Sequence, residues 1–303
     1  MSNKDRKEWL KERKLGIGGS EIAAVMGLSK WRGAYDVYLD KISDLAEESP
    51  SLAMELGNFL EPLVVKKYEQ MTGSKVHPCE SIVSSKYEFA RCNLDGFVVT
   101  QEGDKGILEV KTAGDSRAWG EPGTDEIPED YFLQCQWNMF VSGTTWCDVP
   151  VLFFDRGRHI ELYHITYSKQ IEELMIDAAS KLWQCVESRT PPDPQNADEA
   201  ERMYGSHQPG KTLEADSELI ELVNRIKAVR EEIKKLQEVS KVMEGKIKCE
   251  MAEAESLTDG GKAIVTWRTA NSSRVSISLL KLNHPKIAEE VTTNSTQRRF
   301  LLK

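Results

Sequence analysis

Hydrophobic and polar positions over the first 190 residues predict a mixed α/β unit. Apolar residues recur every three or four positions at 52–72, 131–141 and 169–187, the spacing of helices with a buried face. Apolar and β-branched runs at 96–100, 106–110, 147–154 and 159–166 predict strands. The order is helices, strands, an inserted helix, and then strands with a closing helix. We therefore expect a mixed sheet covered by helices.

The predicted helix at 52–72 carries one acidic residue of interest. Glu61 stands just off the apolar face and directly before Pro62, where we expect the helix to restart or kink. Its carboxylate faces either a site or water, and the local sequence favours water. The predicted buried stripe consists of Leu52, Leu56, Phe59, Leu60, Leu63 and Val64.

A glycine-rich turn near the start of the chain leads into a second short helix. Residues 1–13 predict a charged amphipathic helix containing Trp9, and the next helix is expected to begin with Ser20 as N-cap and to end near Gly27. Free N–H groups at such a helix start favour a phosphate, and Arg13 lies just upstream. Ordinary capping beside a surface arginine explains the same residues and is the favoured interpretation from the local sequence.

The second half of the chain has a different character. Proline and polar residues at 190–211 mark a boundary, which predicts a first domain at 1–190, a linker at 191–212, a helical arm at 213–258 and a small basic α+β tail at 259–303. The tail predicts strands at 263–268 and 274–278 and a helix at 279–290. Its basic residues could contact nucleic acid or a partner.

The arm has apolar residues at alternating spacings of three and four, interrupted by one polar residue, Ser240. The series predicts a coiled coil or a long helical hairpin, about 60 Å long if roughly 40 residues form one helix. A single helix lying on the body is the alternative. The series is Leu219, Leu222, Ile226, Val229, Ile233, Leu236, Ser240, Met243 and Ile247.

Composition narrows the functional classes. The chain has 303 residues, 40% of them hydrophobic, with a net charge of −9. No apolar run approaches the roughly 18 residues of a membrane span, and the charged start is unlike a signal peptide, so we expect a cytoplasmic protein that does not contact membranes. The six cysteines form no CxxC pair, which argues against zinc-ribbon or iron–sulfur sites. The acidic balance disfavours nucleic-acid binding without excluding it.

The strongest chemical signal lies in a predicted hairpin. Asp95 precedes its first strand, and Glu109 and Lys111 flank one residue in its second strand. Alternating side chains put Glu109 and Lys111 on one face. A turn at 101–105 pairs Asp95 with Lys111 and puts all three on that face, an arrangement that a one-residue slip in register would undo. Two carboxylates offer the oxygen ligands that Mg²⁺ prefers, and the ammonium beside them could orient a water molecule. The alternative without a catalytic role is an exposed hairpin with a surface salt bridge.

Two further segments bear on this site. Gln134 forms a polar line with Tyr131 and Asn138 on an otherwise apolar helix, so it either completes a core hydrogen bond or lines a polar site. The loop at 113–130 contains Trp119 and is long enough to act as a flap over a substrate.

Taken together, these segments resemble the YqaJ-type viral recombinase nucleases, which belong with the lambda exonuclease group in the PD-(D/E)xK superfamily. The resemblance covers roughly 9–182, and it departs at Leu94, where the family usually has proline. It rests on ordered motifs: Trp9…Arg13-x6-Ser20-Glu21, Glu55-Leu56-Gly57-Asn58-Phe59-Leu60-Glu61-Pro62, Leu94-Asp95-Gly96, Leu108-Glu109-Val110-Lys111 and Tyr131-x2-Gln134-x-Gln136.

The resemblance implies a PD-(D/E)xK restriction-endonuclease-like core and a role for each motif. Arg13 and Ser20 match the pair that holds a DNA 5′-phosphate, which reverses the local preference for capping, and Trp9 falls at a DNA-contacting position. Lys111 matches the residue that orients the attacking water. The implied metal ligands are Glu61, Asp95, Glu109 and the Val110 carbonyl, and the implied catalytic set is Glu61, Asp95, Glu109, Lys111 and Gln134.

The resemblance also implies an activity. We expect a Mg²⁺-dependent 5′-to-3′ exonuclease on double-stranded DNA, with Mn²⁺ able to substitute, that releases 5′-mononucleotides by a two-metal mechanism and leaves 3′ overhangs for a strand-annealing partner. The family implies a homo-oligomeric ring around DNA, such as a trimer, encoded by a phage or prophage in a bacterial cell. A structure-specific endonuclease of the same fold is the alternative, and a non-catalytic DNA-end scaffold is a third hypothesis.

Overall fold

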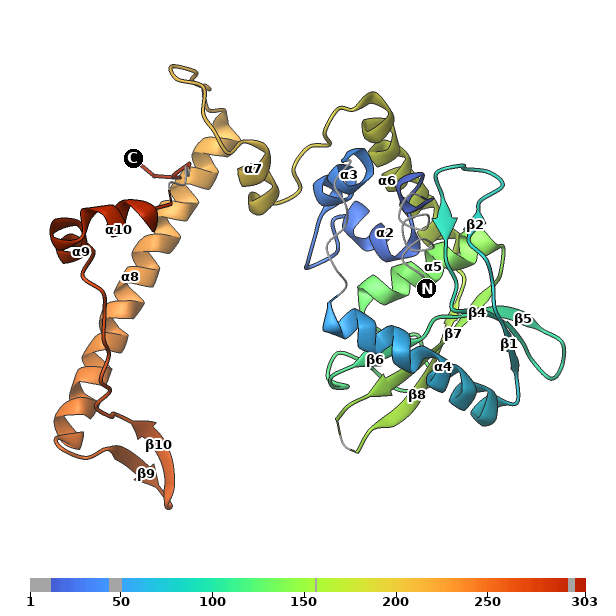
Figure 1. Cartoon of the computed structure of the whole chain (residues 1–303), viewed down its shortest axis with the longest axis horizontal. Helices are drawn as coiled ribbons and strands as arrows, with labels where there is room; N and C mark the ends of the chain where they lie inside the picture. The colour runs from blue at the N-terminus through green and yellow to red at the C-terminus, as the bar shows by residue number, and fades with distance from the viewer. Residues whose placement is uncertain (1–11, 44–50, 156, 294–297) are drawn as a thin grey trace. The chain divides into compact units, whose positions relative to one another are not determined.

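The computed structural model describes residues 12–43, 51–155, 157–293 and 298–303, and it divides into two compact units, Met1–Met203 and Tyr204–Lys303 (Figure 1). The division falls within the predicted linker at 191–212. Trp9 and most of the helix predicted at 1–13 lie outside the described residues.

The first unit is built on a six-stranded mixed sheet. Strand β8 pairs antiparallel with β7 along its whole length, so β5 and β6, both parallel to β7, share the opposite edge of that strand. The strands predicted at 147–154 and 159–166 are confirmed. Along the path the sheet contains β1 (Lys75–His77), β4 (Gly96–Val99), β5 (Lys105–Leu108), β7 (Trp146–Phe153) and β6 (Lys111–Ala113), with β8 (His159–Thr166) beside β7.

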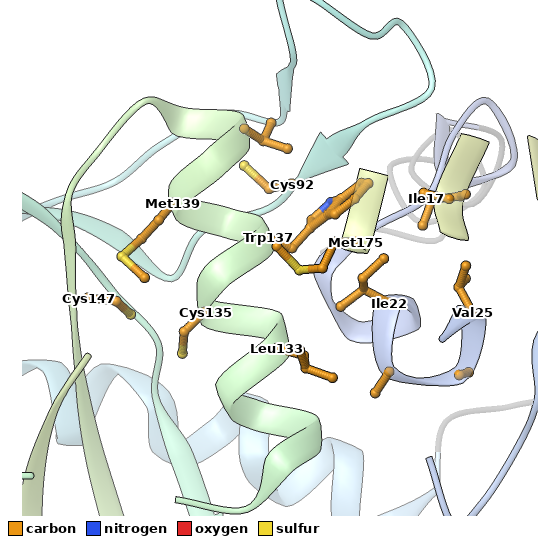
Figure 2. Close-up of a cluster of buried hydrophobic side chains, with 14 of the residues drawn as sticks. Ile17, Ile22, Val25, Cys92, Leu133, Cys135, Trp137, Met139, Cys147 and Met175 are labelled. Carbon is orange, nitrogen blue, oxygen red and sulfur yellow. The ribbon is translucent and has the colours of Figure 1, made fainter. Parts of the chain in front are cut away.

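Helices on one face of the sheet enclose the main core. Apolar side chains of α5 contact both the sheet and the N-terminal helices: Figure 2 shows Leu133 and Trp137 directed toward Ile22, and Met139 on the other side, near Cys147. The helices predicted at 131–141 and 169–187 are confirmed. The helices in this unit are α2 (Gly19–Val25), α3 (Ala34–Ile42), α4 (Leu52–Thr72), α5 (Glu129–Ser142), α6 (Lys169–Ser188) and α7 (Ala197–Met203); a short pair, β2 (Ile82–Val83) and β3 (Arg91–Cys92), lies outside the main sheet.

Helix α4 lies on the other face of the sheet, and its predicted buried stripe is confirmed at Val64 but wrong for most of its length. Only Val64 and Tyr68 are buried in this helix, whereas Leu52 and Phe59 are each 80% exposed. The helix continues through Pro62 without a break. Amphipathic spacing identifies an apolar face but not how much of its length is covered, and here the C-terminal half supplies the buried contacts.

The hairpin of β4 and β5 has a register two residues away from the predicted one. Phe97 pairs with Ile107 and Val99 with Lys105, so continuing the ladder places Asp95 opposite Glu109. An even shift retains side-chain parity. Phe97 and Ile107 accordingly pack in the main core, while Val98 and Leu108 pack with Tyr68 on the α4 side.

The second unit is dominated by one long helix. Helix α8 (Ser217–Met251) is continuous, so the hairpin-arm alternative is wrong. The strand predicted at 274–278 is also wrong, because Ser276 accepts a hydrogen bond from the Leu279 N–H as the N-cap of a helix. The remaining elements are β9 (Ser256–Asp259), β10 (Lys262–Thr266), α9 (Ile277–Asn283) and α10 (Pro285–Glu290). In the described parts of both units, no helix is both long and apolar enough to cross a membrane.

Candidate active site

Glu109 is the centre of a buried hydrogen-bond network. Its Oε1 accepts from Lys111 Nζ at 2.5 Å and from Gln134 Nε2 at 2.6 Å, and its Oε2 accepts from Asn138 Nδ2 at 3.0 Å. Gln134 Oε1 also accepts from Lys111 Nζ at 3.1 Å. Gln134 and Asn138 are four residues apart, so one face of α5 presents both amides to the carboxylate.

A break in the strand brings Asp95 to the same place. Strand β5 ends at Leu108 and β6 begins at Lys111, leaving Glu109 and Val110 between them. The Glu109 N–H continues the ladder to the Asp148 carbonyl at 3.0 Å. The Val110 N–H instead donates to Asp95 Oδ2 at 2.6 Å. The break therefore releases one backbone donor, and Asp95 uses it.

The carboxylates at the site strongly influence one another. Burial and the charge of Glu109 raise the pKa of Asp95 to about 8. Burial and Glu109 also raise the pKa of Glu61, which reaches the site from α4. Burial lowers the pKa of Lys111, but the ion pair with Glu109 has the larger effect, so the pKa of Lys111 is raised overall. When ionised, three carboxylates share one ammonium, which leaves excess negative charge.

These residues match a divalent cation in ligand type and charge. Carboxylate oxygens are the preferred ligands of Mg²⁺, and the excess negative charge is of the sign that a cation neutralises. Within the described residues, however, no three Asp, Glu, His or Cys side chains are gathered closely enough to hold a metal. Glu109 is bound instead by Lys111, Gln134 and Asn138. The Val110 carbonyl remains a predicted ligand.

A pocket of about 140 Å³ adjoins this network. Arg13 and Ser20, the predicted phosphate-binding pair, both line it, and Arg91 adds a second guanidinium. Gln134 and Asn138 line it as well. Two amides that bind Glu109 thus also form part of the wall of a pocket with basic side chains.

Buried Glu21 lines the pocket and binds its neighbours there. It accepts two hydrogen bonds from Lys41 Nζ, at 2.7 and 2.8 Å, and lies 3.6 Å from the Arg13 guanidinium. It also accepts from the Gly18 N–H at 2.9 Å, which makes Gly18 the N-cap of α2. The prediction of Ser20 as N-cap is therefore wrong. Ser20 lies in the first turn, with its exposed side chain lining the pocket.

Close packing of α2 on α5 depends on a glycine. A Cβ atom at Gly19 would lie 2.3 Å from Asn138 Oδ1, so a larger residue would displace the Asn138 side chain. Asn138 is 1% exposed, and its Oδ1 has no hydrogen-bond partner in the described structure. The side chain has a buried acceptor left over after its amide donates to Glu109.

The structure brings together Asp95, Glu109, Lys111 and Gln134 directly and adds Glu61 through its electrostatic coupling. Sequence reasoning missed the contributions of Lys41, Arg91 and Asn138. The spacing of Asn138 from Gln134 was a usable signal, as was a basic residue four positions before Asp95. Nothing in the local sequence around Lys41 indicated that it would be buried against Glu21.

The mixed sheet, with an acidic pair and a lysine around a strand break, has the architecture of the PD-(D/E)xK fold. The chain belongs to the family of the YqaJ-like viral recombinase domain, whose profile matches residues 8–145. An uncharacterized protein, YqaJ, of Bacillus subtilis (strain 168) is 30% identical over 311 residues, which cover 100% of this chain and 95% of that protein.

Solved structures share the fold. The alkaline exonuclease LHK-Exo from Laribacter hongkongensis matches with a TM-score of 0.51 and 22% identity, covering 61% of this chain and 94% of that one. A structure of LHK-Exo in complex with dAMP matches with the same TM-score and identity over 65% of this chain and 97% of that one.

Proposed function

We propose that this protein is a Mg²⁺-dependent exonuclease that degrades one strand of double-stranded DNA from its 5′ end. The observation that carries the proposal is the sharing of Gln134 and Asn138 between the Glu109 network and the basic pocket. A phosphate held in the pocket would place the adjoining part of a DNA strand near the carboxylates. The fold shared with LHK-Exo, which is an alkaline exonuclease and has been solved with dAMP, supports exonuclease activity.

Metal binding would involve Glu61, Asp95, Glu109 and the Val110 carbonyl. A bound divalent ion supplies a more acidic water and stabilises charge on phosphate oxygens, and Mn²⁺ is expected to substitute for Mg²⁺. The negative excess of the site and the raised pKa of Asp95 support cation binding at this place. Because Glu109 is hydrogen-bonded on both oxygens, ion binding must compete with those contacts.

Lys111 would act on the water and on the scissile phosphate. Its ammonium is held by Glu109 and Gln134 and lies 4.8 Å from the centre of the Tyr131 ring. Its raised pKa keeps it protonated, so its role would be to orient the water and to neutralise charge that develops on the phosphate.

The pocket would set the direction of digestion. Arg13 and Arg91 supply guanidinium groups that suit phosphate, and Ser20 supplies a hydroxyl. Each cut exposes a new 5′-phosphate on the shortened strand, so the same pocket could be refilled after every step. The expected products are 5′-mononucleotides and a 3′ overhang.

The wider role that we propose rests on family membership. A 3′ overhang is the substrate of a strand-annealing protein, so we propose such a partner, together with a ring-shaped homo-oligomer around DNA and a phage or prophage origin in a bacterial cell. The viral recombinase description of the matched family supports a place in DNA recombination.

Digestion of labelled duplex DNA with and without Mg²⁺ tests this function. Linear duplex with a 5′-phosphate should be degraded faster than the same duplex with a 5′-hydroxyl, and closed circular DNA should stay intact. Arg13→Ala should reduce the preference for the phosphorylated end, with Lys181→Ala as the control because Lys181 pairs with Asp177 on an exposed helix face.

The other outcomes assign other functions. Cutting of closed circular or branched DNA would favour the structure-specific endonuclease. Binding of DNA ends without any Mg²⁺-dependent cleavage would favour the scaffold. Equal digestion of both types of 5′ end would argue against the phosphate pocket.

A further inference from the structure

The apolar series along α8 forms a complete heptad seam. Its nine positions alternate at spacings of three and four, so they occupy the a and d positions of successive heptads. The a positions are Leu219, Ile226, Ile233, Ser240 and Ile247, and the d positions are Leu222, Val229, Leu236 and Met243.

This seam is exposed along its whole length. Met251 is the only buried residue of α8, and the eight apolar seam residues are each 37–62% exposed. A helix of 35 residues that keeps such a stripe in water loses the burial that normally stabilises helices in proteins. The seam therefore leaves a long apolar stripe exposed to water.

We propose that α8 pairs in parallel and in register with α8 of a second copy of this chain. Three of the five a positions are isoleucine and two of the four d positions are leucine, the combination that favours two strands in parallel coiled coils. In this arrangement the one polar layer meets itself, so Ser240 lies opposite Ser240 of the second copy and their hydroxyls can bond.

The charges of α8 nearly balance in total, but one contact in the proposed pair is repulsive. The helix contains eight Lys and Arg against seven Glu, so two copies carry almost no net repulsion. The flanking g and e positions in the parallel arrangement meet at one like-charged pair, Arg225 with Arg230 of the second copy. Reversing that charge gives a gain-of-association test, because opposite charges at g and e favour pairing.

A disulfide reports the orientation directly. In the full-length protein, Ser240→Cys combined with Cys249→Ser should form a covalent dimer on mild oxidation, since equivalent a positions meet only in a parallel, in-register pair. Cys249→Ser alone, which removes the exposed native thiol of α8, is the control and should form none. Absence of the cross-link in the double variant would overturn the arrangement.

Sedimentation of the full-length protein measures the strength of association. Ile233→Lys with Leu236→Lys should weaken it by at least about tenfold, whereas Glu231→Lys with Glu238→Lys, at the outer f positions, should leave it nearly unchanged. Arg225→Glu should tighten it several-fold. Unchanged association in the seam variant, or a monomeric wild-type protein, would overturn the proposal. The readout is independent of nuclease activity, so failure of the α8 pairing would leave the proposed cleavage of DNA standing.

Discussion

Asn138 and Glu109 are joined by a buried hydrogen bond of 3.0 Å, from the Asn138 amide to Glu109 Oε2. Gln134, one helical turn earlier, binds the other oxygen at 2.6 Å. Helix α5 therefore determines the orientation of the carboxylate on both sides. Groups that orient a metal-binding carboxylate affect metal affinity without touching the metal.

We therefore expect Asn138→Ala to lower the affinity for Mg²⁺. The Mg²⁺ concentration that gives half-maximal cleavage should rise by about 10- to 100-fold. Mn²⁺ binding followed by electron paramagnetic resonance gives a readout that needs no turnover. Gln136→Ala is the matched control, because Gln136 binds the Thr166 carbonyl and the Ser168 N–H away from Glu109. It should lower stability and leave the metal requirement alone. An unchanged metal requirement in Asn138→Ala would contradict the assignment.

Removal of the lysine at the site tests the chemical step. Lys111→Ala should reduce cleavage by at least about 10²–10³-fold, because it removes the charge that we propose acts on the reacting phosphate. Lys105→Ala provides the control from the same hairpin, since Lys105 is an exposed residue at the start of β5. Single-turnover cleavage at saturating Mg²⁺ is the measurement. Activity close to wild type in Lys111→Ala would exclude its proposed role.

The raised pKa of Asp95 predicts how stability depends on pH. Folding shifts this pKa from 3.8 to about 8, so between these values the folded protein binds more protons than the unfolded chain. Stability of the metal-free protein should therefore decrease as pH rises through this window. Denaturant unfolding across the window measures the slope, which Asp95→Asn should reduce. Stability that rises with pH in wild type, with no difference from Asp95→Asn, would refute the shift.

The same ionisation should affect the metal binding that we propose. Below about pH 8 the site must release a proton from Asp95 before the cation is bound, so Mg²⁺ affinity and cleavage should both increase with pH. Calorimetry in buffers of different ionisation enthalpy would count the released proton. Proton-free binding at neutral pH would show that Asp95 is already ionised.

Tyr68 fastens the helix that carries Glu61. Its hydroxyl donates to Asp148 Oδ2 at 2.5 Å, and Val64 is the only other buried residue of α4. Tyr68→Phe should lower the free energy of unfolding by about 1.5–3 kcal/mol, the range for a hydrogen bond to a charged group. Tyr87→Phe is the control, because the half-buried Tyr87 ring packs on Phe89 without a hydroxyl bond among the described residues. Equal effects of the two substitutions would argue against the anchor.

Sequence patterns predicted β7, β8, α5 and α6 well because each has a strong period over many residues. The site residues also came together despite an incorrect register. Side-chain parity depends only on whether a shift is even, so a two-residue error left Asp95 and Glu109 on the same face.

Tertiary contacts decided the remaining features. Leu52 and Phe59 belong to a helix with a clear apolar stripe, yet the contacts that bury α4 lie farther along it. Gln134 and Gln136 are two residues apart on one helix, yet Gln134 donates to Glu109 whereas Gln136 links β8 to α6. Only the packing of the fold distinguishes these two roles. Such distinctions arise from which neighbours pack against each face, which a local pattern does not contain.

The hydrogen bond from the Val110 N–H to Asp95 can form only when the hairpin has the correct register. A hairpin displaced by one residue would turn Asp95 away from the released amide and leave that donor without its partner. The misaligned chain would also lack a complete acidic cluster, so an error in strand pairing would yield an inert molecule rather than one that cuts DNA at the wrong place. The carboxylate that we expect to bind metal thus links correct assembly to the ability to cleave.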